Sequence, residues 1–289
     1  MQLTVRTAAK VNLTLDVMGR RKDGFHNIRS VMQSIGLFDH ITLTETSSGN
    51  VTISCNVPEV PCNQRNIASR CAYLFFNTLG KQVDGLHINI EKKIPIQAGL
   101  AGGSADGAAV LVGLNEMFHH PFSADELKKI GGNVGADIPF CLHGGTALAE
   151  GTGTKLTSLR NIPACSFVLV KPPIGISTAE AYQSVDTSKN IPNGNTDEMI
   201  YVIDNLEKIG KNLSNTFEYT LNIQELLDIK FDLAQSKGCV GACMSGSGST
   251  VFGIFPKREK AEICAEAFKK KYNQVFVADS VEYSTYVLG

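Results

Sequence analysis

The chain has 289 residues, of which 43% are hydrophobic and 19% are charged. Its 27 basic and 28 acidic residues leave a net charge of −1, which excludes the basic excess typical of proteins that bind nucleic acid or acidic membranes. No apolar run approaches the roughly 20 residues of a membrane span, and the first residues lack a signal-peptide pattern. We therefore expect a cytoplasmic, globular protein with no nucleic-acid or membrane partner.

The hydrophobic pattern predicts two successive units, each with mixed helices and strands. In the first unit, strand-like alternation over residues 3–57 is followed by a helix at 66–79, a strand at 86–94, a helix at 103–118 and a helix that opens at Ser123 with capping-box spacing to Glu126. In the second unit, a strand at 167–170 is followed by helices near 178–186, 196–209, 222–236 and 258–272 and by strands at 251–255 and 274–279. The predicted fold class is α+β.

Residues 8–17 alternate as in a half-buried strand. One face carries the apolar residues Val11, Leu13, Leu15 and Val17. Lys10 and Asn12 share the other face and therefore point the same way. A lone lysine on a strand is usually a solvated charge at a sheet edge, so this pattern leaves the role of Lys10 open.

Between residues 94 and 113, a glycine-rich turn leads directly into a small-residue, apolar helix. Gly99, Gly102 and Gly103 lack a Cβ and can adopt a positive φ, so their amides can close on an anion at the positive end of the helix dipole. No lysine follows as in a P-loop, and no G-x-G-x-x-G follows a strand. The segment predicts a phosphate cradle of another kind, although a plain loop with a tight helix entry has the same composition.

The residues around these glycines support a rigid site. Pro95 ends the preceding strand, and Ser104 supplies a hydroxyl for a helix cap or a metal. Asp106 is expected in the first helical turn, where negative charge is favoured. Because residues 108–114 are apolar on all sides, the helix is expected inside the protein.

Two further segments combine polar residues with tight turns. Asp137 lies in a small-residue turn before an apolar run, where aspartate is common as a helix cap or turn residue. Residues 246–249, Gly-Ser-Gly-Ser, precede the apolar run 251–255, so a loop leading into a strand is favoured over a flexible linker. Asn66 stands where the helix at 66–79 needs an N-cap.

The cysteines and histidines do not predict a metal centre. The eight cysteines include no C-x-x-C pair and lie mostly in apolar surroundings, so they are expected to be buried free thiols. His119 and His120 are neighbours that point apart on a helix or strand and are poor joint ligands.

Three segments, in this order along the chain, resemble the motifs of the GHMP kinases, which are ATP-dependent kinases of small molecules. Residues 8–13 resemble the N-terminal motif, residues 95–105 the central P-x-x-x-G-L-x-x-S-[SA]-A motif, and residues 241–252 the third, glycine-rich motif. Gly-Phe-His at 24–26 and Gly-Ala-Asp-Ile-Pro at 135–139 resemble one branch of the family. That branch phosphorylates a hydroxyl of a polyol linked to cytidine diphosphate, in the non-mevalonate isoprenoid pathway.

The resemblance implies an architecture and a chemistry. The expected architecture is an N-terminal domain, 1–157, of the ribosomal S5 domain 2-like type and a C-terminal α/β sandwich, 158–289, with the active site in the cleft between them. By the same resemblance, Asp137 accepts the proton of the attacking hydroxyl and Lys10 keeps that carboxylate ionised and attracts the transferring phosphoryl group. Asn12 would position the substrate.

The resemblance also implies which residues bind the two substrates. Those expected to bind ATP and its phosphates are Asn66, Pro95, Ile96, Gln97, Ala98, Gly99, Leu100, Ala101, Gly102, Gly103, Ser104 and Ala105. Those expected to bind the cytidyl substrate are Asn12, Phe25, His26, Thr178, Tyr182, Gly246, Ser247 and Gly248. Phe25 and Tyr182 would sandwich the cytosine ring while His26 reads its edge, although both aromatic residues also suit core or surface positions. Mg²⁺ is expected to arrive with ATP, held mainly by phosphates and by Ser104.

Two departures and two alternatives remain. Phe25 stands where the family usually has tyrosine, and Ala105 stands where a second serine is common, so each position lacks one hydroxyl. One alternative is another GHMP member, such as homoserine kinase or diphosphomevalonate decarboxylase, and the other is a non-catalytic nucleotide-binding module. Lys10, Phe25, His26 and Asp137 together argue against the first alternative. Lys10 and Asp137, with no basic excess, argue against the second. The sequence is compatible with a monomer or a homodimer.

Overall fold

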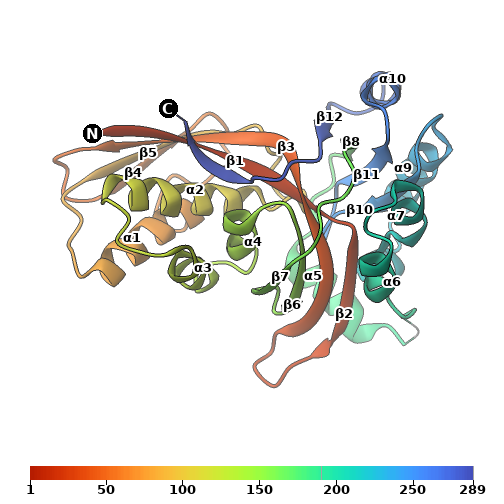
Figure 1. The fold of residues 1–289 in the computed structure, drawn as a ribbon, viewed down its shortest axis with the longest axis horizontal. Coiled ribbons are helices and arrows are strands. Elements are labelled where there is room, and N and C mark those ends of the chain that lie inside the picture. The colour runs from red at the N-terminus through yellow and green to blue at the C-terminus, as the bar shows by residue number, and fades with distance from the viewer. Residues whose placement is uncertain (190, 289) are drawn as a thin grey trace.

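Two β-sheets with helices packed on them make up the computed structural model, which describes residues 1–189 and 191–288 (Figure 1). The larger sheet has nine strands in these residues: β1 (Gln2–Asn12), β2 (Thr14–Arg20), β3 (His26–Glu45), β4 (Val51–Cys55), β5 (Leu86–Glu91), β6 (Thr146–Gly151), β7 (Lys155–Ser158), β9 (Ser214–Asn215) and β13 (Thr285–Leu288). The smaller sheet has four, in the spatial order β10 (Gly241–Met244), β11 (Val251–Phe255), β8 (Ser166–Lys171) and β12 (Gln274–Asp279). The smaller sheet is built from the second predicted unit alone, whereas the larger sheet combines strands of the first unit with β9 and β13 of the second.

The long strand β3 joins the parts of the larger sheet. Its C-terminal half pairs with β5 and its N-terminal half with β6, while β1 runs antiparallel along most of its length. Apolar side chains on the two central strands, among them Val11, Val31 and Ile35, are fully buried. The strand β13 pairs with residues 4–7 of β1, so Lys10 and Asn12, which pair with β3, lie beyond that contact.

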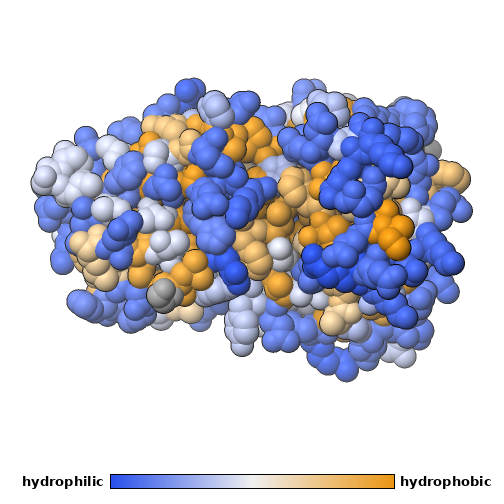
Figure 2. Space-filling model, turned by 90° about the horizontal axis from the view of Figure 1, so that it is seen from above, coloured by the Kyte–Doolittle hydropathy of each residue, from blue (hydrophilic) through white to orange (hydrophobic). Residues whose placement is uncertain are grey.

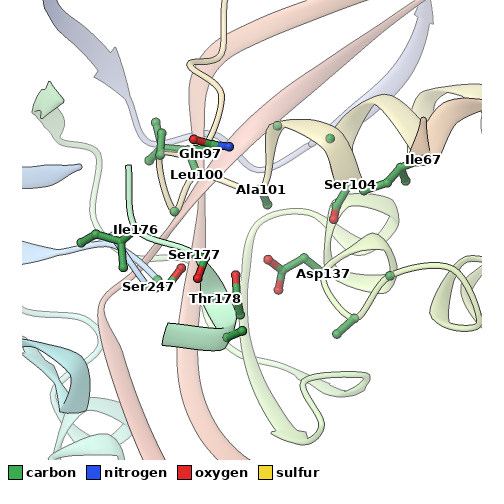
Figure 3. Close-up of a pocket in the computed structure, with 18 of the residues that line it drawn as sticks. Ile67, Gln97, Leu100, Ala101, Ser104, Asp137, Ile176, Ser177, Thr178 and Ser247 are labelled. Carbon is green, nitrogen blue, oxygen red and sulfur yellow. The ribbon is translucent and has the colours of Figure 1, made fainter. Parts of the chain in front are cut away.

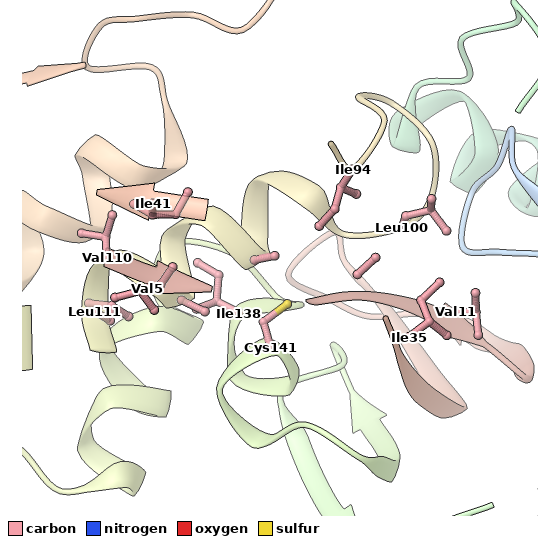
Figure 4. Packing of buried hydrophobic residues seen from close by; sticks show 14 of the residues in the cluster. Val5, Val11, Ile35, Ile41, Ile94, Leu100, Val110, Leu111, Ile138 and Cys141 are labelled. Atoms are coloured by element: carbon pink, nitrogen blue, oxygen red, sulfur yellow. The ribbon is translucent and has the colours of Figure 1, made fainter. Parts of the chain in front are cut away.

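Three helices lie on one face of the larger sheet, namely α1 (Ile67–Leu79), α2 (Gly102–Met117) and α4 (Ile138–His143), and α3 (Ala124–Gly132) packs against these helices. The helix α2 is buried along most of its length, as its apolar run predicts. Figure 4 shows Val110 and Leu111 of this helix among Val5 and Ile41 of the sheet. The start of α2 is thereby fixed by core packing.

Six helices accompany the second half of the described chain. The helices α9 (Gln224–Gln235) and α10 (Arg258–Lys269) pack on the smaller sheet, and α7 (Leu206–Asn212) packs on β10. The helices α5 (Thr178–Thr187), α6 (Thr196–Tyr201) and α8 (Thr216–Leu221) contact β2 of the larger sheet. These contacts hold the two halves of the chain together.

The chain returns twice to the larger sheet after its first half. The short strand β9 pairs with β2 in parallel, and β13 pairs with β1 antiparallel, so the two ends of the chain lie near each other (Figure 1). The expected domain boundary near residue 157 falls within β7.

Most predicted elements are present, and the errors concern short ones. The single helix predicted at 196–209 is wrong, because the chain turns after α6 and Asn205 caps a separate helix, α7, by accepting from the Lys208 amide. The prediction missed α4, α8 and the strands β6, β7, β9, β10 and β13. Elements of this length carry too few residues for a periodic signal.

The cysteines are free thiols: five are buried, Cys55 and Cys239 are half-buried, and Cys62 is exposed. His119 and His120 lie in the turn after α2 with positive φ, not on a helix or strand as expected.

No helix in the described ranges is long and apolar enough to cross a membrane. Hydrophilic residues cover most of the face shown in Figure 2, with smaller hydrophobic patches among them.

Candidate functional site

A cleft of about 1780 Å³ opens between the start of α2, the turn before α4 and the start of α5. Every residue predicted to act in catalysis or binding borders this cleft except Ala105, which is fully buried. Figure 3 shows Ser104 and Asp137 on one side, and Ser177, Thr178 and Ser247 across from them. The fold therefore brings together segments from nearly the whole chain.

Residues 95–101, called the phosphate loop below, form a tight turn at the start of α2. Gln97, Gly99 and Ala101 adopt positive φ values of 49°, 72° and 59°. Of the three glycines that can adopt such values, only Gly99 does so, because Gly102 and Gly103 form the first turn of α2. Two non-glycine residues in the left-handed region are uncommon and indicate a loop held by its surroundings.

The third glycine-rich segment, residues 241–250, and β1 hold the phosphate loop in place. The Ser245 hydroxyl donates to the Gly99 carbonyl oxygen at 2.9 Å, and the Lys10 amide donates to the Leu100 carbonyl oxygen at 3.2 Å. A Cβ on Gly99 would overlap the Ser245 carbonyl oxygen. The segment thus supports the phosphate loop as well as bordering the cleft, a role that the sequence analysis missed.

Ser104 is the third residue of α2, so the interpretation as a helix cap is wrong. The N-cap position is taken by Ala101, whose side chain cannot accept a hydrogen bond. The first amides of α2 are therefore left without a side-chain partner, as in anion sites at helix N-termini. Gly135 leaves room beside the serine, since a Cβ there would lie 3.6 Å from Ser104 Oγ.

Lys10 is buried against a carboxylate. Its side chain is 5% exposed, and Nζ donates to Asn12 Oδ1 at 2.7 Å and lies 3.5 Å from Asp137 Oδ2. The alternative of a solvated charge at a sheet edge is excluded. The Asp137 side chain remains 32% exposed, so the pair can meet a ligand in the cleft.

Asp137 stands at the start of α4 without capping it. It occupies the N-cap position, and Pro139 follows in the first turn, but its side chain makes no capping hydrogen bond. Asp137 therefore lies at the start of a helix, as expected for a cap residue, but its side chain does not cap the helix. The carboxylate is left free to face Lys10 and the cleft.

A buried charge cluster beside the start of α2 was not predicted. Lys92 Nζ lies 2.5 Å from Asp39 Oδ2 and 2.9 Å from Asp106 Oδ2, and a Cβ on Gly102 would come 2.8 Å from that nitrogen. Asp106 therefore lies in the second turn of α2 and pairs with Lys92, which corrects the expectation that it would sit in the first turn. Burial raises the pKa of Asp106; the Lys92 ammonium opposes this, and the Asp39 carboxylate adds to it.

Asp106→Asn is expected to become more stable relative to the wild type as the pH rises. Because the folded state raises the pKa of Asp106 from 3.8 to about 8, the stability contributed by its protonated form is complete below the lower value and is lost as the pH rises through the higher one. The amide has no proton to lose. Thermal unfolding at about pH 5, 7 and 9 tests this. A Tm difference that stays constant with pH would contradict it, and Asp125→Asn on the exposed face of α3 is the control.

The aromatic residues predicted to bind the base, Phe25 and Tyr182, both border the cleft. Phe25 is 65% exposed between β2 and β3, and the buried His26 ring stacks on Tyr182 with centroids 4.7 Å apart. Tyr182 also meets Phe217 edge to face, and burial raises the pKa of its hydroxyl to about 12. One face of Tyr182 is thus covered by His26.

Asp186 is a further cleft residue that the sequence analysis missed. Its carboxylate accepts from His26 Nε2 at 2.8 Å and lies 3.5 Å from Arg20. The contact fixes the orientation of the His26 ring and ties α5 to the turn between β2 and β3. Since the partners are far apart in sequence, no local pattern reveals this contact.

Asn66 caps α1 by accepting a hydrogen bond from the Ala68 amide at 2.8 Å, and it also borders the cleft.

No group of three or more His, Cys, Asp or Glu side chains among the described residues could hold a metal ion. Any cation at the phosphate loop would have to share its coordination with a ligand.

Comparisons with known proteins agree with this geometry. The model of the GHMP kinases N terminal domain matches residues 66–145, and that of the GHMP kinases C terminal domain matches residues 200–274. A 4-diphosphocytidyl-2-C-methyl-D-erythritol kinase of Clostridium botulinum (strain Alaska E43 / Type E3) is 42% identical, over 96% of this chain and 100% of the relative.

Two solved structures are also similar. A 4-(cytidine 5'-diphospho)-2C-methyl-D-erythritol kinase has a TM-score of 0.79 at 28% identity and covers 97% of this chain and 99% of its own. A homoserine kinase from Cytophaga hutchinsonii has the same TM-score at 19% identity, with 99% and 97% covered. The fold alone therefore does not separate these two activities.

Proposed function

Because this chain belongs to the GHMP kinase family, we propose that it transfers the γ-phosphoryl group of ATP to the 2-hydroxyl of 4-diphosphocytidyl-2-C-methyl-D-erythritol, in isoprenoid biosynthesis. The observation that carries the proposal is one cleft in which the phosphate loop, the Lys10–Asp137 pair and an aromatic group meet. Relatives similar over nearly the whole chain bear the name of this kinase, which favours it over homoserine kinase and diphosphomevalonate decarboxylase.

In the proposed reaction, the substrate hydroxyl oxygen forms a bond to the γ-phosphorus, and the bond from that phosphorus to the β–γ bridging oxygen breaks, releasing ADP. Asp137 accepts the hydroxyl proton. Lys10 stabilises the charge on the transferring group from its buried position beside that carboxylate. Positioning accounts for most of the rate in such reactions, so a rigid phosphate loop suits the task.

ATP use follows from membership of a kinase family, and the residues that hold ATP are our proposal. The phosphate loop and the first amides of α2 would bind the phosphates, with Asn66 near the base. Mg²⁺, when bound with ATP, would neutralise phosphate charge, and the Ser104 hydroxyl is the kind of oxygen ligand that it prefers.

The cytosine ring would be held by Phe25 and Tyr182, with His26 at its edge. Since the His26 ring covers one face of Tyr182, the base needs either the remaining face or a rotation of His26. Thr178 at the start of α5 and residues 246–248 border the same part of the cleft and would contact the rest of this substrate.

Phe25→Ala is expected to raise the KM for the cytidyl substrate by about tenfold and to leave the KM for ATP nearly unchanged. A base–aromatic stack is worth about 1–3 kcal/mol, and Phe25 is not among the residues proposed to bind ATP. Steady-state kinetics with each substrate varied in turn measures both constants. Met18→Ala, on the neighbouring strand and similarly exposed at 61%, is the control. Parallel changes in the two constants would contradict the stacking role.

We further propose a domain boundary near residue 157, a cytoplasmic location, and a monomer or homodimer as the working form. The smaller sheet begins with β8 at Ser166, shortly after that boundary.

The test of the proposed function is ADP release from ATP and Mg²⁺ with 4-diphosphocytidyl-2-C-methyl-D-erythritol. The uncytidylated polyol, homoserine and diphosphomevalonate serve as parallel substrates. Turnover confined to the cytidyl substrate would support the proposal. Turnover on another substrate would move the function within the family, and no ADP from any of them would favour a non-catalytic binding module.

A further inference from the structure

A chain of buried hydrogen bonds leads from Lys10 into the larger sheet. Lys10 Nζ donates to Asn12 Oδ1 at 2.7 Å, Asn12 Nδ2 donates to Ser30 Oγ at 2.7 Å, and Ser30 Oγ donates to the Thr14 carbonyl oxygen at 2.5 Å. Asn12 is 1% exposed, and Ser30 and Thr14 are not exposed at all. Water is therefore not available as a substitute partner for these groups.

The direction of this chain is fixed by its last member. A carbonyl oxygen can only accept, so the single proton of the Ser30 hydroxyl is used in the bond to Thr14. Ser30 Oγ can then only accept from Asn12, which turns the amide nitrogen toward the serine and the amide oxygen toward Lys10. The Lys10 ammonium has donors only, so it requires that same amide orientation.

We propose that Ser30, on β3, is a positioning residue for the reaction: it fixes the Asn12 amide and, through it, places the Lys10 ammonium beside Asp137. One of the three Lys10 donors is used by Asn12, which leaves two for Asp137 and for the transferring group. The inference rests on the proposed roles of Lys10 and Asp137 and adds a residue that does not border the cleft.

A second serine on β3 provides a matched control. Ser34 is also fully buried and lies opposite Lys10 in the register of β1 and β3. Its hydroxyl oxygen has no hydrogen-bond partner among the described residues. Burial on this strand therefore does not by itself give a serine hydroxyl a hydrogen-bond partner, and Ser34 can serve to separate the specific role of Ser30 from the effect of losing a buried hydroxyl.

The test compares the kinetics of Ser30→Ala and Ser34→Ala in the full-length enzyme. Ser30→Ala is expected to lower kcat by about tenfold, which corresponds to one hydrogen bond of ordinary strength, and to leave the KM for ATP unchanged. Ser34→Ala should keep the wild-type kcat. In an Asn12→Ala background, Ser30→Ala should have little further effect, because the group that it positions is gone. An equal loss of kcat in both backgrounds would overturn the proposal.

A second pair of variants keeps the test valid if Ser30→Ala folds poorly. Threonine and valine have nearly the same shape, so Ser30→Thr and Ser30→Val should disturb the packing around residue 30 to the same extent. The two variants differ only in whether a hydroxyl is present. Per folded molecule, Ser30→Thr should retain a kcat at least several-fold above that of Ser30→Val. Equal values would overturn the proposal.

The variant Lys10→Met distinguishes a failure of the proposed role of Lys10 from a failure of the role of Ser30 alone. Normal turnover in that variant would overturn the role of Lys10 and this inference with it. If Lys10→Met is inactive while Ser30→Ala and Ser34→Ala have the same kcat, only the proposed role of Ser30 is wrong.

Discussion

Asp137→Asn is expected to lower kcat by about 10²–10⁴-fold, the usual contribution of a positioned general base, and to change the KM for ATP little. The amide keeps the size of the side chain but cannot accept the proton of the attacking hydroxyl. It also removes the negative charge that lies 3.5 Å from Lys10 Nζ, so the ammonium loses its carboxylate partner. Single-turnover measurements of ADP formation, with enzyme in excess over ATP and the cytidyl substrate saturating, report this step directly.

The control for this variant is Asp125→Asn. Asp125 lies on α3 with its side chain 84% exposed, so its replacement should leave kcat unchanged. If Asp137→Asn keeps near-normal turnover, Asp137 is not the base, and positioning by Lys10 and the phosphate loop would have to account for the rate. A joint loss of kcat and thermal stability would point to a structural role instead.

Gly99→Ala is expected to weaken ATP binding by about tenfold or more and to lower the thermal stability. The backbone of Gly99 has a φ of 72°, where an alanine costs roughly 1–2 kcal/mol. A Cβ would also overlap the Ser245 carbonyl oxygen, which belongs to backbone and cannot rotate away. The phosphate loop and residues 241–250 would have to separate, and the amides that we propose to bind the phosphates would move with them.

Gly103→Ala is the matched control for this prediction. Gly103 is helical, and a Cβ there would meet only the end of the Ile67 side chain, at 3.3 Å. Thermal unfolding and the KM for ATP should therefore change much less than in Gly99→Ala. Equal effects of the two variants would show that the fit between the phosphate loop and the third motif does not control nucleotide binding.

Local patterns in the sequence were enough to predict the larger elements and most of the residues that border the cleft. The alternation at residues 8–17 predicted that Lys10 and Asn12 share a face, and they are hydrogen-bonded in the structure. The apolar run at 108–114 predicted that α2 is buried. Such predictions succeed because periodicity and glycine spacing depend on neighbours in sequence. Short elements such as α4 lack that signal.

The network around the site was decided only by the tertiary structure. Lys92 meets Asp39 across 53 positions of sequence, and Asp186 meets His26 across 160. Nothing in the local sequence of these residues distinguishes them from surface charges, because burial and partners arise from the packing of distant segments.

The phosphate loop shows the same division. Its position and glycine content could be predicted from the sequence, but the sequence did not indicate which residues take left-handed backbone. Gln97 and Ala101 do so, while Gly102 and Gly103 begin the helix α2. Contacts from β1 and from residues 241–250 fix these conformations against the intrinsic preference of the chain. The sequence by itself thus determined the family, the order of the longer elements and the chemical groups that border the cleft, whereas long-range packing decided their burial, orientation and support.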